Sequence, residues 1–395
     1  MTTPKIAYLA KGRLHVKDSD AAPRIVESKF GLAVRDRAVR SQNTHSWKTE
    51  GRGAQFMMGG AFWGGPRRDP AAMRIAMTSV ARSRESGKLL YALETDEVAG
   101  LFAVDVAGGE EKRLFHGNSL RVQHPATRPE VELIACSVPQ PAGTANLAVM
   151  RADGSELLEV TEGDSLDLAP AWVPHQPQLV YQTAGLGRDR EGNFLGYGPS
   201  ALHQIDLKTN EIKTLVEDPA TDFLGPKVAE DGTLWAIRRP WKSAEVKVSL
   251  WRFFLDVVLF PWRLLVALYH FLNFFVVRYT GKPLSSSGDA RKQAADMQKM
   301  MVWGNLIDAD KNARKARLAG EEAPDLVPPS WQLVRIPPGE GKAPEVAAKG
   351  VLSFDLCADG TVLYSNGSAV FLLGKDGKAE RIHKDEQIEQ VVALE

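Results

Sequence analysis

The chain has 395 residues, and its 49 lysines and arginines balance its 49 aspartates and glutamates. A balanced charge provides no global attraction to nucleic acid or to an anionic membrane, and we expect no nucleic-acid partner. The two cysteines, Cys136 and Cys357, lie in apolar, strand-like runs without metal-ligand spacing. This pattern favours free buried thiols and a reducing compartment.

Short strands are predicted at both ends of the chain. The stretch KIAYLAKGRLHVKDSDAAPRIVES, residues 5–28, divides into three β-forming runs separated by turn residues. The N-terminus has neither a continuous apolar region nor a small-residue cleavage site, so we expect no secretory signal and a cytoplasmic location. The C-terminal QIEQVVALE, residues 387–395, adds one strand. The simplest inference is that the two ends share one sheet.

Residues 29–73 are predicted to be a long irregular insertion after the first strands. This insertion is locally basic although the whole chain is neutral. The cations expected to orient a docking surface here are Arg35, Arg37, Arg40, Arg67 and Arg68. The Gly-rich run GRGAQFMMGGAFWGG, residues 51–65, has two interpretations. It is either a loop packed over the fold or an apolar finger that touches lipid or a partner through Phe56, Met57, Met58, Phe62 and Trp63.

Two kinds of segment alternate along the rest of the chain. In the first kind, a short strand and a turn precede a strongly apolar strand, as in HPATRPEVELIACS (124–137), APAWVPHQPQLVYQT (169–183), GPKVAEDGTLWAIRR (225–239) and FDLCADGTVLYSN (354–366). In the second kind, an apolar strand, a turn and a more polar strand follow one another, as in LFAVDVAGGEEKRLF (101–115), NLAVMRADGSELLEV (146–160), LHQIDLKTNEIKTLV (202–216) and AVFLLGKDGKAERI (369–382). Joined together, the two kinds make four antiparallel strands, the composition of a propeller blade, and we count six such units.

One repeat carries a specific resemblance. Residues Pro170, Trp172 and Pro174, together with the turns Asp231-Gly232 and Asp359-Gly360, resemble the TolB-like (PD40, WD40-like) β-propeller repeat. The resemblance implies an all-β, six-bladed β-propeller closed by the C-terminal strand, with a large α-helical insertion in blade five. Because the export signal of periplasmic TolB proteins is missing, a Tol-Pal role is not implied.

The expected domain organisation follows from this count. Residues 1–240 form blades one to four and the first part of blade five, with the basic insertion at 29–73. Residues 241–330 form the helical insertion, and residues 331–395 complete blade five, blade six and the ring-closing strand. The loop GLGRDREGNFLGYGPS, residues 185–200, and the insertion both follow the second strand of a blade. We therefore expect them, and residues 29–73, on one face of the disc, which suggests a working surface.

The insertion is predicted to contain two helical parts. In LWRFFLDVVLFPWRLLVALYHFLNFFVVRY, residues 250–279, the few polar residues share one narrow helical stripe, and Pro261 should kink or break the helix. Residues 285–320 predict a water-tolerant helix, followed by the stiff linker EEAPDLVPPS. A membrane span is disfavoured because Arg263 lies near the midpoint of the apolar segment and no second apolar segment returns the chain.

Three placements of the apolar segment remain open. It lies in a membrane interface, it is buried against other subunits or a membrane-protein partner, or it covers the propeller within its own chain. The residues expected to bind membrane or partner are Trp251, Phe253, Phe254, Leu255, Val258, Leu259, Trp262, Leu265, Leu268, Phe271, Leu272 and Phe275. The cations expected to orient them near anionic headgroups are Arg252, Arg263, Arg278 and Lys282.

Catalytic motifs are not found in the sequence. The eight histidines form no zinc pattern, and neither a G-x-S-x-G elbow nor a phosphate loop is present. We therefore expect no metal, no cofactor and no enzyme, but a non-catalytic scaffold that docks peripherally on the inner face of a membrane and assembles proteins. One alternative is a propeller hydrolase or lyase, which predicts charged residues converging on the central channel. Another is a soluble subunit of a hetero-complex that buries the helix.

Overall fold

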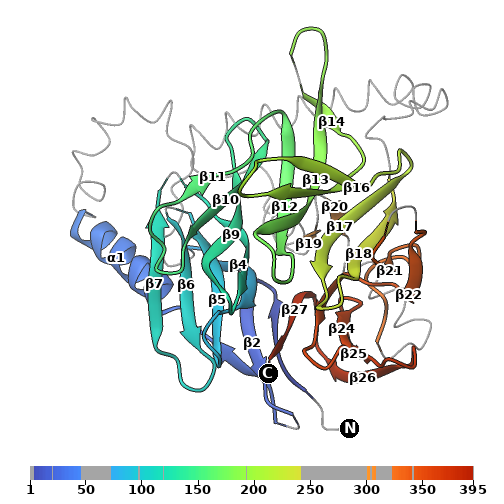
Figure 1. The fold of residues 1–395 in the computed structure, drawn as a ribbon. Helices are drawn as coiled ribbons and strands as arrows, with labels where there is room; N and C mark the ends of the chain where they lie inside the picture. Colours follow the sequence, from blue (N-terminus) through green and yellow to red (C-terminus); the bar gives the residue numbers. More distant parts are fainter. Residues whose placement is uncertain are drawn as a thin grey trace, which may run out of the picture.

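A computed structural model describes residues 4–45, 73–241, 300–307 and 323–394 of the chain, except positions 20, 97, 119, 193, 303, 304, 340 and 341. The described residues form 27 strands and one helix, so the fold is almost entirely β (Figure 1). The two ends of the chain lie on the side of the molecule opposite the projecting strand β14 (Phe194–Tyr197) (Figure 1).

Four sheets are antiparallel meanders of four strands each. Their strand orders are β27-β1-β2-β3, β4-β5-β6-β7, β17-β18-β21-β22 and β23-β24-β25-β26. The bounds are β27 (Ile388–Leu394), β1 (Lys5–Ala10), β2 (Arg13–Lys17), β3 (Arg24–Val26), β4 (Ile75–Arg82), β5 (Lys88–Thr95), β6 (Ala99–Asp105), β7 (Glu111–Gly117), β17 (Thr221–Val228), β18 (Leu234–Pro240), β21 (Gln332–Ile336), β22 (Glu345–Lys349), β23 (Ser353–Leu356), β24 (Val362–Ser365), β25 (Ala369–Leu373) and β26 (Ala379–Lys384).

A fifth, nine-stranded sheet contains two more antiparallel groups. The first group is β8-β9-β10-β11 and the second is β12-β13-β15-β16, with β14 paired to the far end of β13. Within the described ranges, the two groups are joined by one parallel pair, Ala145 with Leu166. The bounds are β8 (Gln123–Arg128), β9 (Val131–Pro139), β10 (Ala145–Arg151), β11 (Leu158–Glu159), β12 (Ser165–Trp172), β13 (Gln178–Arg188), β15 (Ala201–Asp206) and β16 (Ile212–Val216).

The first strands of these groups contact one another in a closed cycle. Strand β27 contacts β4, and contacts then link β4 to β8, β8 to β12, β12 to β17, β17 to β23, and β23 back to β27. The predicted sharing of one sheet by the chain ends is confirmed, because Lys5 in β1 pairs with Leu394 in β27. The sheet edge that an open array would leave is removed by this pairing.

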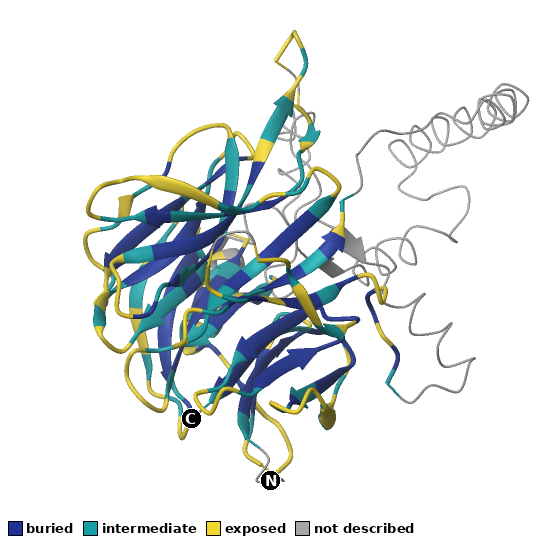
Figure 2. Cartoon of the chain, turned by 45° about the vertical axis from the view of Figure 1, so that its right-hand side comes forward, coloured by how far each residue is buried: buried dark blue, intermediate teal, exposed yellow. Residues whose placement is uncertain are grey.

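Apolar side chains fill the spaces between neighbouring sheets. One cluster joins Leu9 and Val392 of the first sheet to Leu89 and Tyr91 of the second. Another joins Ile237 and Leu333 to Phe354 and Tyr364, which lie in the next sheet. Figure 2 shows the strands mostly buried and the turns between them exposed. The alternation seen in the sequence thus reflects sheets packed face to face, which is how a blade array buries its core.

Two matches to the predicted repeat have a clear structural role. The Trp172 side chain is buried, and its Nε1 donates to the Ala126 carbonyl at 3.1 Å, linking β12 to β8. Gly232 and Gly360 have φ angles of +82° and +81°, which glycine adopts without a Cβ clash. In each turn the preceding aspartate accepts a bond from the residue after the glycine, at 2.9 Å.

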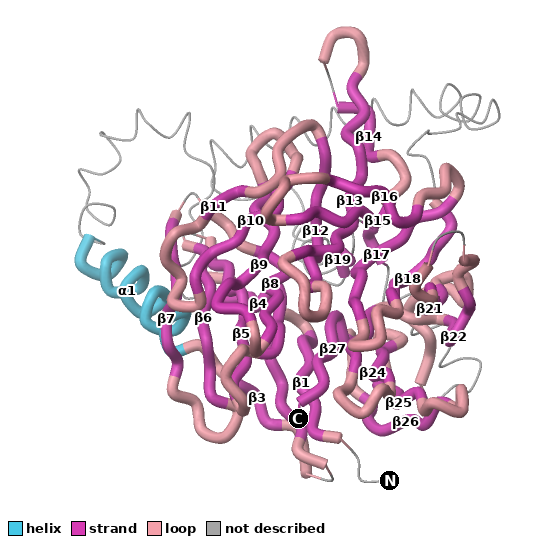
Figure 3. The backbone as a smooth tube through the Cα atoms, viewed as in Figure 1, coloured by secondary structure: helices cyan, strands magenta, loops and turns pink. Residues whose placement is uncertain are grey.

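Helix α1 (Lys29–His45) occupies part of the insertion predicted to be irregular, so that prediction was wrong over these residues. The Ser28 hydroxyl accepts from the Gly31 amide at 3.1 Å, as an N-cap does. The Glu111 carboxylate of β7 accepts from the amides of Lys29 and Phe30 at 2.7 and 3.1 Å. A carboxylate at this end also complements the helix dipole. Figure 3 shows the helix lying beside β7.

Two further predictions in the insertion were wrong. The helix expected over 285–320 is contradicted by a hairpin of β19 (Met300–Val302) and β20 (Asn305–Ile307), which flank a Trp-Gly pair in the sequence. The end of the expected linker is part of the core, because Leu326 and Val327 are buried between two sheets. The Asp325 carboxylate also accepts from the Asn366 side-chain amide at 2.7 Å, which fixes this stretch to the fold.

The apolar segment 250–279 lies outside the described residues, as does the Gly-rich run 51–65. Within the described part of the chain, no helix is long and apolar enough to cross a bilayer. The predicted loop 185–200 is present as an extension of β13 that pairs with β14. Three large side chains on it, Phe194, Leu195 and Tyr197, are exposed.

Candidate functional site

A cavity of about 2810 Å³ lies where the first strands face one another. Residues of β27, β4, β8, β12, β17 and β23 line it, together with the turns that follow several of these strands. Small-molecule pockets usually measure about 300–1,000 Å³, so this space is larger than a typical metabolite needs. Because strands from all six groups line it, this cavity is the candidate functional site.

The cavity wall has a repeated backbone irregularity. Residues His124, Ala169 and Gly225 have φ angles of 49°, 51° and 57°, and a proline follows each of them in the sequence. The strand register shifts at each of these places. Because proline has no N–H, the irregular position leaves no backbone donor unpaired there. The bulges bend the first strands where they approach one another.

Polar side chains tie neighbouring groups together at this wall. The Gln390 side chain of β27 both donates to and accepts from the Val80 backbone of β4, at 2.8 and 3.0 Å. The Ser79 hydroxyl accepts from the His124 amide at 3.1 Å. The Gln182 side chain accepts from the Gly225 amide at 2.7 Å. These bonds satisfy backbone groups freed by the irregular strands, and they hold β4 against β27 and β8, and β17 against β13.

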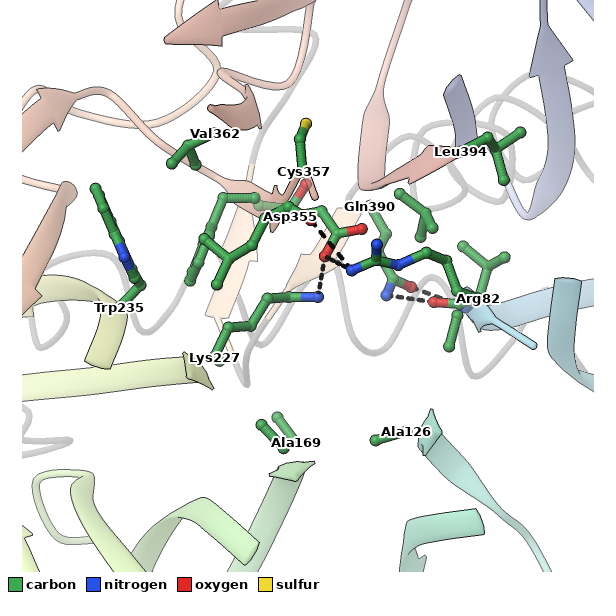
Figure 4. Close-up of a pocket in the computed structure, with 18 of the residues that line it drawn as sticks. Arg82, Ala126, Ala169, Lys227, Trp235, Asp355, Cys357, Val362, Gln390 and Leu394 are labelled. Carbon is green, nitrogen blue, oxygen red and sulfur yellow. Dashed lines mark hydrogen bonds and ion pairs between the residues drawn. The ribbon is translucent and has the colours of Figure 1, made fainter. Parts of the chain in front are cut away.

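An ion-paired cluster crosses the cavity between strands that are distant in sequence. The Asp355 carboxylate of β23 is 2% exposed, and its Oδ1 lies 2.6 Å from Lys227 Nζ and 3.8 Å from Arg82 Nη2. Its Oδ2 accepts from the Ala393 amide at 2.9 Å. Figure 4 shows Lys227 and Arg82 extending toward Asp355 from different sides, with Ala126 and Ala169 across the cavity. Four strands thus meet at one carboxylate.

The electrostatics of this cluster favour a permanent charge. Burial alone would raise the pKa of Asp355, but the positive charges of Lys227 and Arg82 and two hydrogen bonds outweigh it and lower that pKa. Nearby, burial raises the pKa of the half-buried Cys357 thiol. A charged, fully hydrogen-bonded Asp355 is a poor proton donor or acceptor, and a protonated Cys357 is a poor nucleophile.

Other charged side chains at the cavity are also paired. Arg128 lies 3.0 Å from Glu130 and 2.7 Å from Glu230, which follows β17. Arg335 pairs with Glu345 at 2.8 Å. Among the residues that the structure describes, no group of three or more His, Cys, Asp or Glu side chains could hold a metal ion. The described ion pairs hold neighbouring strands together, and among them there is no recognisable nucleophile–base pair.

None of the sequence-predicted site residues that the structure describes lines this cavity. Arg35, Arg37 and Arg40 are on α1, where Arg37 and Arg40 are exposed. The remaining predicted residues lie outside the described ranges: Phe56, Met57, Met58, Phe62, Trp63, Arg67, Arg68, Trp251, Arg252, Phe253, Phe254, Leu255, Val258, Leu259, Trp262, Arg263, Leu265, Leu268, Phe271, Leu272, Phe275, Arg278 and Lys282.

Sequence reasoning missed the cluster of Arg82, Lys227 and Asp355. The available signal was an aspartate within the apolar run FDLC and a lysine directly after the Gly225-Pro226 irregularity. Neither residue has a motif of its own, because the three come from separate groups of strands and meet only in the folded ring.

Comparison with known proteins identifies the fold. No family model matches this sequence, and no curated protein is similar to it. Among solved structures, TolB from Acinetobacter baumannii is similar over 100% of this chain and 67% of its own, with 11% identity and a TM-score of 0.52. The nidogen/laminin complex is similar over 99% of both chains, with 7% identity and a TM-score of 0.52. The chain therefore has a TolB-like β-propeller fold, as the repeat predicted.

Enzymes are also among the similar structures. A puromycin-hydrolyzing peptidase from Mycobacterium tuberculosis matches 95% of this chain and 42% of its own, with 13% identity and a TM-score of 0.44. An oligogalacturonate lyase in complex with manganese matches with a TM-score of 0.34. Likeness at this level carries no argument for a reaction, since one fold hosts unrelated functions.

Proposed function

We propose that this protein is a non-catalytic scaffold built on a closed, six-bladed propeller. The six antiparallel groups would be the blades, β27 would close the ring, and residues 241–330 would be an insertion within the fifth blade. Support comes from the closed cycle of contacts between first strands and from the paired, charged state of the cavity residues. The likeness to TolB and to the nidogen/laminin complex is consistent with a role in protein–protein contact.

We further propose that one face docks on a membrane or on a membrane-protein partner. The observation that carries this proposal is the position from which the insertion departs. Strand β18, the second of its group, ends at Pro240, opposite Thr221 at the start of the first strand β17. Likewise β13, a second strand, runs past the start of the first strand β12, and β4 is the first strand of its group. The start of a first strand and the end of a second strand lie at the same edge of each group. The insertion, the β14 extension and the chain leading into β4 would thus emerge on one face. Helix α1, with Arg37 and Arg40 exposed, packs beside the start of β4 through Gly31, which lies against Ile75.

Two kinds of interaction would contribute to docking. The apolar side chains of residues 250–279 would supply affinity, since burying each large apolar side chain contributes about 1.5–3 kcal/mol. Arginines would supply orientation through anionic headgroups, at about 1 kcal/mol for each cation near the surface. We place the protein on the cytoplasmic side of the membrane as part of this proposal, with the opposite face free for a second partner.

Flotation with anionic liposomes tests the docking proposal on the full chain. We expect the intact protein to float with vesicles that contain phosphatidylserine, and a deletion of residues 249–280 to remain at the bottom while keeping its β circular-dichroism spectrum. The triple variant Arg35→Gln, Arg37→Gln, Arg40→Gln should float less at low salt and equally at high salt.

Three results would change the proposal. An intact protein that is monomeric and does not float contradicts membrane docking and points to a helix buried in its own fold. Solubility that depends on co-expression with another subunit, without flotation, favours a hetero-complex that covers the helix. Turnover of a peptide or glycan substrate lost on Asp355→Asn would instead support an enzyme with its site in the cavity.

A further inference from the structure

The junction between the first and last sheets contains a polar cluster that the proposed function does not use. Tyr8 of β1 is fully buried, and its hydroxyl donates to Asp385 Oδ2 at 2.7 Å, across 377 positions of sequence. His383 Nε2 of β26 lies 3.0 Å from the same hydroxyl. The ring of His15 on β2 stacks on Tyr8 with centroids 4.9 Å apart. Residues of β1, β2, β26 and the turn before β27 are thus held together.

The number of protons that each side chain carries determines which group donates in these hydrogen bonds. A tyrosine hydroxyl has one proton, and Tyr8 uses it on Asp385. His383 must therefore donate from Nε2 to the Tyr8 oxygen, so its neutral form carries hydrogen on Nε2. A second proton on His383 would go to Nδ1 and would place a full positive charge in the junction.

The surroundings disfavour that charge. His15 and His383 are both half-buried, and burial lowers the pKa of each imidazole. The positive charge of Arg13 lowers the pKa of His15 further. Lys17 and His15 likewise lower the pKa of His383. Among the described residues, the Asp385 carboxylate acts in the opposite direction and raises the pKa of both imidazoles. If both imidazoles were protonated, they and the side chains of Arg13 and Lys17 would be four cations near the single Asp385 carboxylate.

We propose that Tyr8, His15, His383 and Asp385 form a pH-sensitive latch that holds the first sheet against the last at neutral pH and loosens this junction in mild acid. The apolar part of the same junction, including Ile6, Leu363 and Val391, is buried beneath the cluster. Protonation of His15 and His383 would therefore weaken the packing where the first and last sheets meet. This device is independent of the docking proposal, since none of its residues belongs to the docking face residues named above.

The pH window follows from linkage. An imidazole whose folded-state pKa is lowered contributes stability while it is neutral, above the unfolded-state value of about 6.5. That stability is lost progressively as pH falls below about 6.5 and approaches the lowered folded-state values. Both half-buried rings are accessible to solvent protons, so opening of the junction does not have to precede protonation.

Hydrogen exchange read by mass spectrometry at pH 7.5 and 5.5, corrected for intrinsic rates, tests the latch. We expect peptides from β1, β2, β26 and β27 to exchange about tenfold faster at pH 5.5, while peptides from β5 and β6 change little. The variant His15→Phe, His383→Gln keeps the stacking and the bond to Tyr8 and should lose this local response. The matched control His203→Gln changes a half-buried histidine of another sheet and should retain it.

A second variant keeps the test decisive if the first does not fold. Asp385→Asn retains an acceptor for Tyr8 but removes the compensating anion, so its acid response at the junction should exceed that of the intact protein. A uniform response over all sheets overturns the latch, as does a local response unchanged in either variant.

Discussion

Buried acidic side chains in this protein each have a partner that compensates for the lost hydration. Asp222 is 4% exposed, and its carboxylate accepts from Arg239 Nε and from the Ser200 amide at 2.8 and 2.9 Å. The Arg239 guanidinium also lies over the Trp331 ring, 4.8 Å from its centroid. Removing one member of such a pair leaves an uncompensated charge, which costs more than the pair itself contributes.

Arg239→Met is accordingly expected to lower the free energy of unfolding by about 3 kcal/mol, because Asp222 would remain buried and charged. Arg335→Met, which breaks the exposed pair with Glu345, should lower it by less than about 1 kcal/mol. Urea denaturation of both variants measures the difference. Equal losses would show that burial does not set the cost of breaking these pairs.

The lowered pKa of Asp355 predicts a second effect at single residues. A carboxyl whose folded-state pKa lies below its unfolded value of about 3.9 stabilises the fold above that pH and loses this contribution as pH falls. Asp355→Asn should therefore be less stable at pH 7 and should lose less stability than the intact protein between pH 4 and 2. Thermal unfolding across this range checks it, with Glu162→Gln, which changes an exposed carboxyl in a loop of another sheet, as the control.

Helix α1 shows how an element can depend on a residue far from it in sequence. Its first amides bond to Ser28 and to Glu111, which belongs to β7. The basic and mixed composition of this stretch hid the helix from sequence analysis, because the contact that stabilises its start comes from another sheet. The strands, by contrast, could be predicted, since turn residues such as Gly232 and Gly360, which have a positive φ, separate the apolar runs.

Glu111→Gln should weaken the start of α1 by about 1 kcal/mol, because a neutral side chain loses the charge-assisted bonds to the first amides. Amide exchange at residues 29–34 should rise about fivefold, while β4 to β6 remain protected. Glu110→Gln changes the exposed neighbouring carboxylate and should have no such effect. Unchanged exchange in both variants would mean that packing of Phe30 and Val34 alone holds the helix.

At the scale of the whole molecule, the closed ring accounts for what sequence could and could not predict. The repeated strand pairs and the sharing of one sheet by residues 5–28 and 387–395 followed from local patterns. The cavity cluster did not, because Arg82, Lys227 and Asp355 share no motif and are brought together only by closure. The buried stretch around Leu326 was similarly missed, since its Pro-rich composition is also typical of a linker.

Closure by β27 makes a direct prediction for the whole molecule. Deleting residues 387–395 should abolish cooperative unfolding, because it exposes the edge of β1 and removes buried Val391 and Val392. A circular permutant that joins residue 394 to residue 5 through a short Gly-Ser linker and opens at Gly108-Gly109 should remain folded, since both ends of the new join are already adjacent. A folded deletion variant would show that the ring does not need its last strand.

The pairing of β1 with β27 also has a consequence for how the protein is made. Strand β1 is synthesised nearly 390 residues before its partner, because Lys5 pairs with Leu394. Contacts of such large sequence separation form slowly, because loop-closure entropy must be overcome first. Until β27 has been synthesised, the edge of β1 therefore stays open to pairing with other chains.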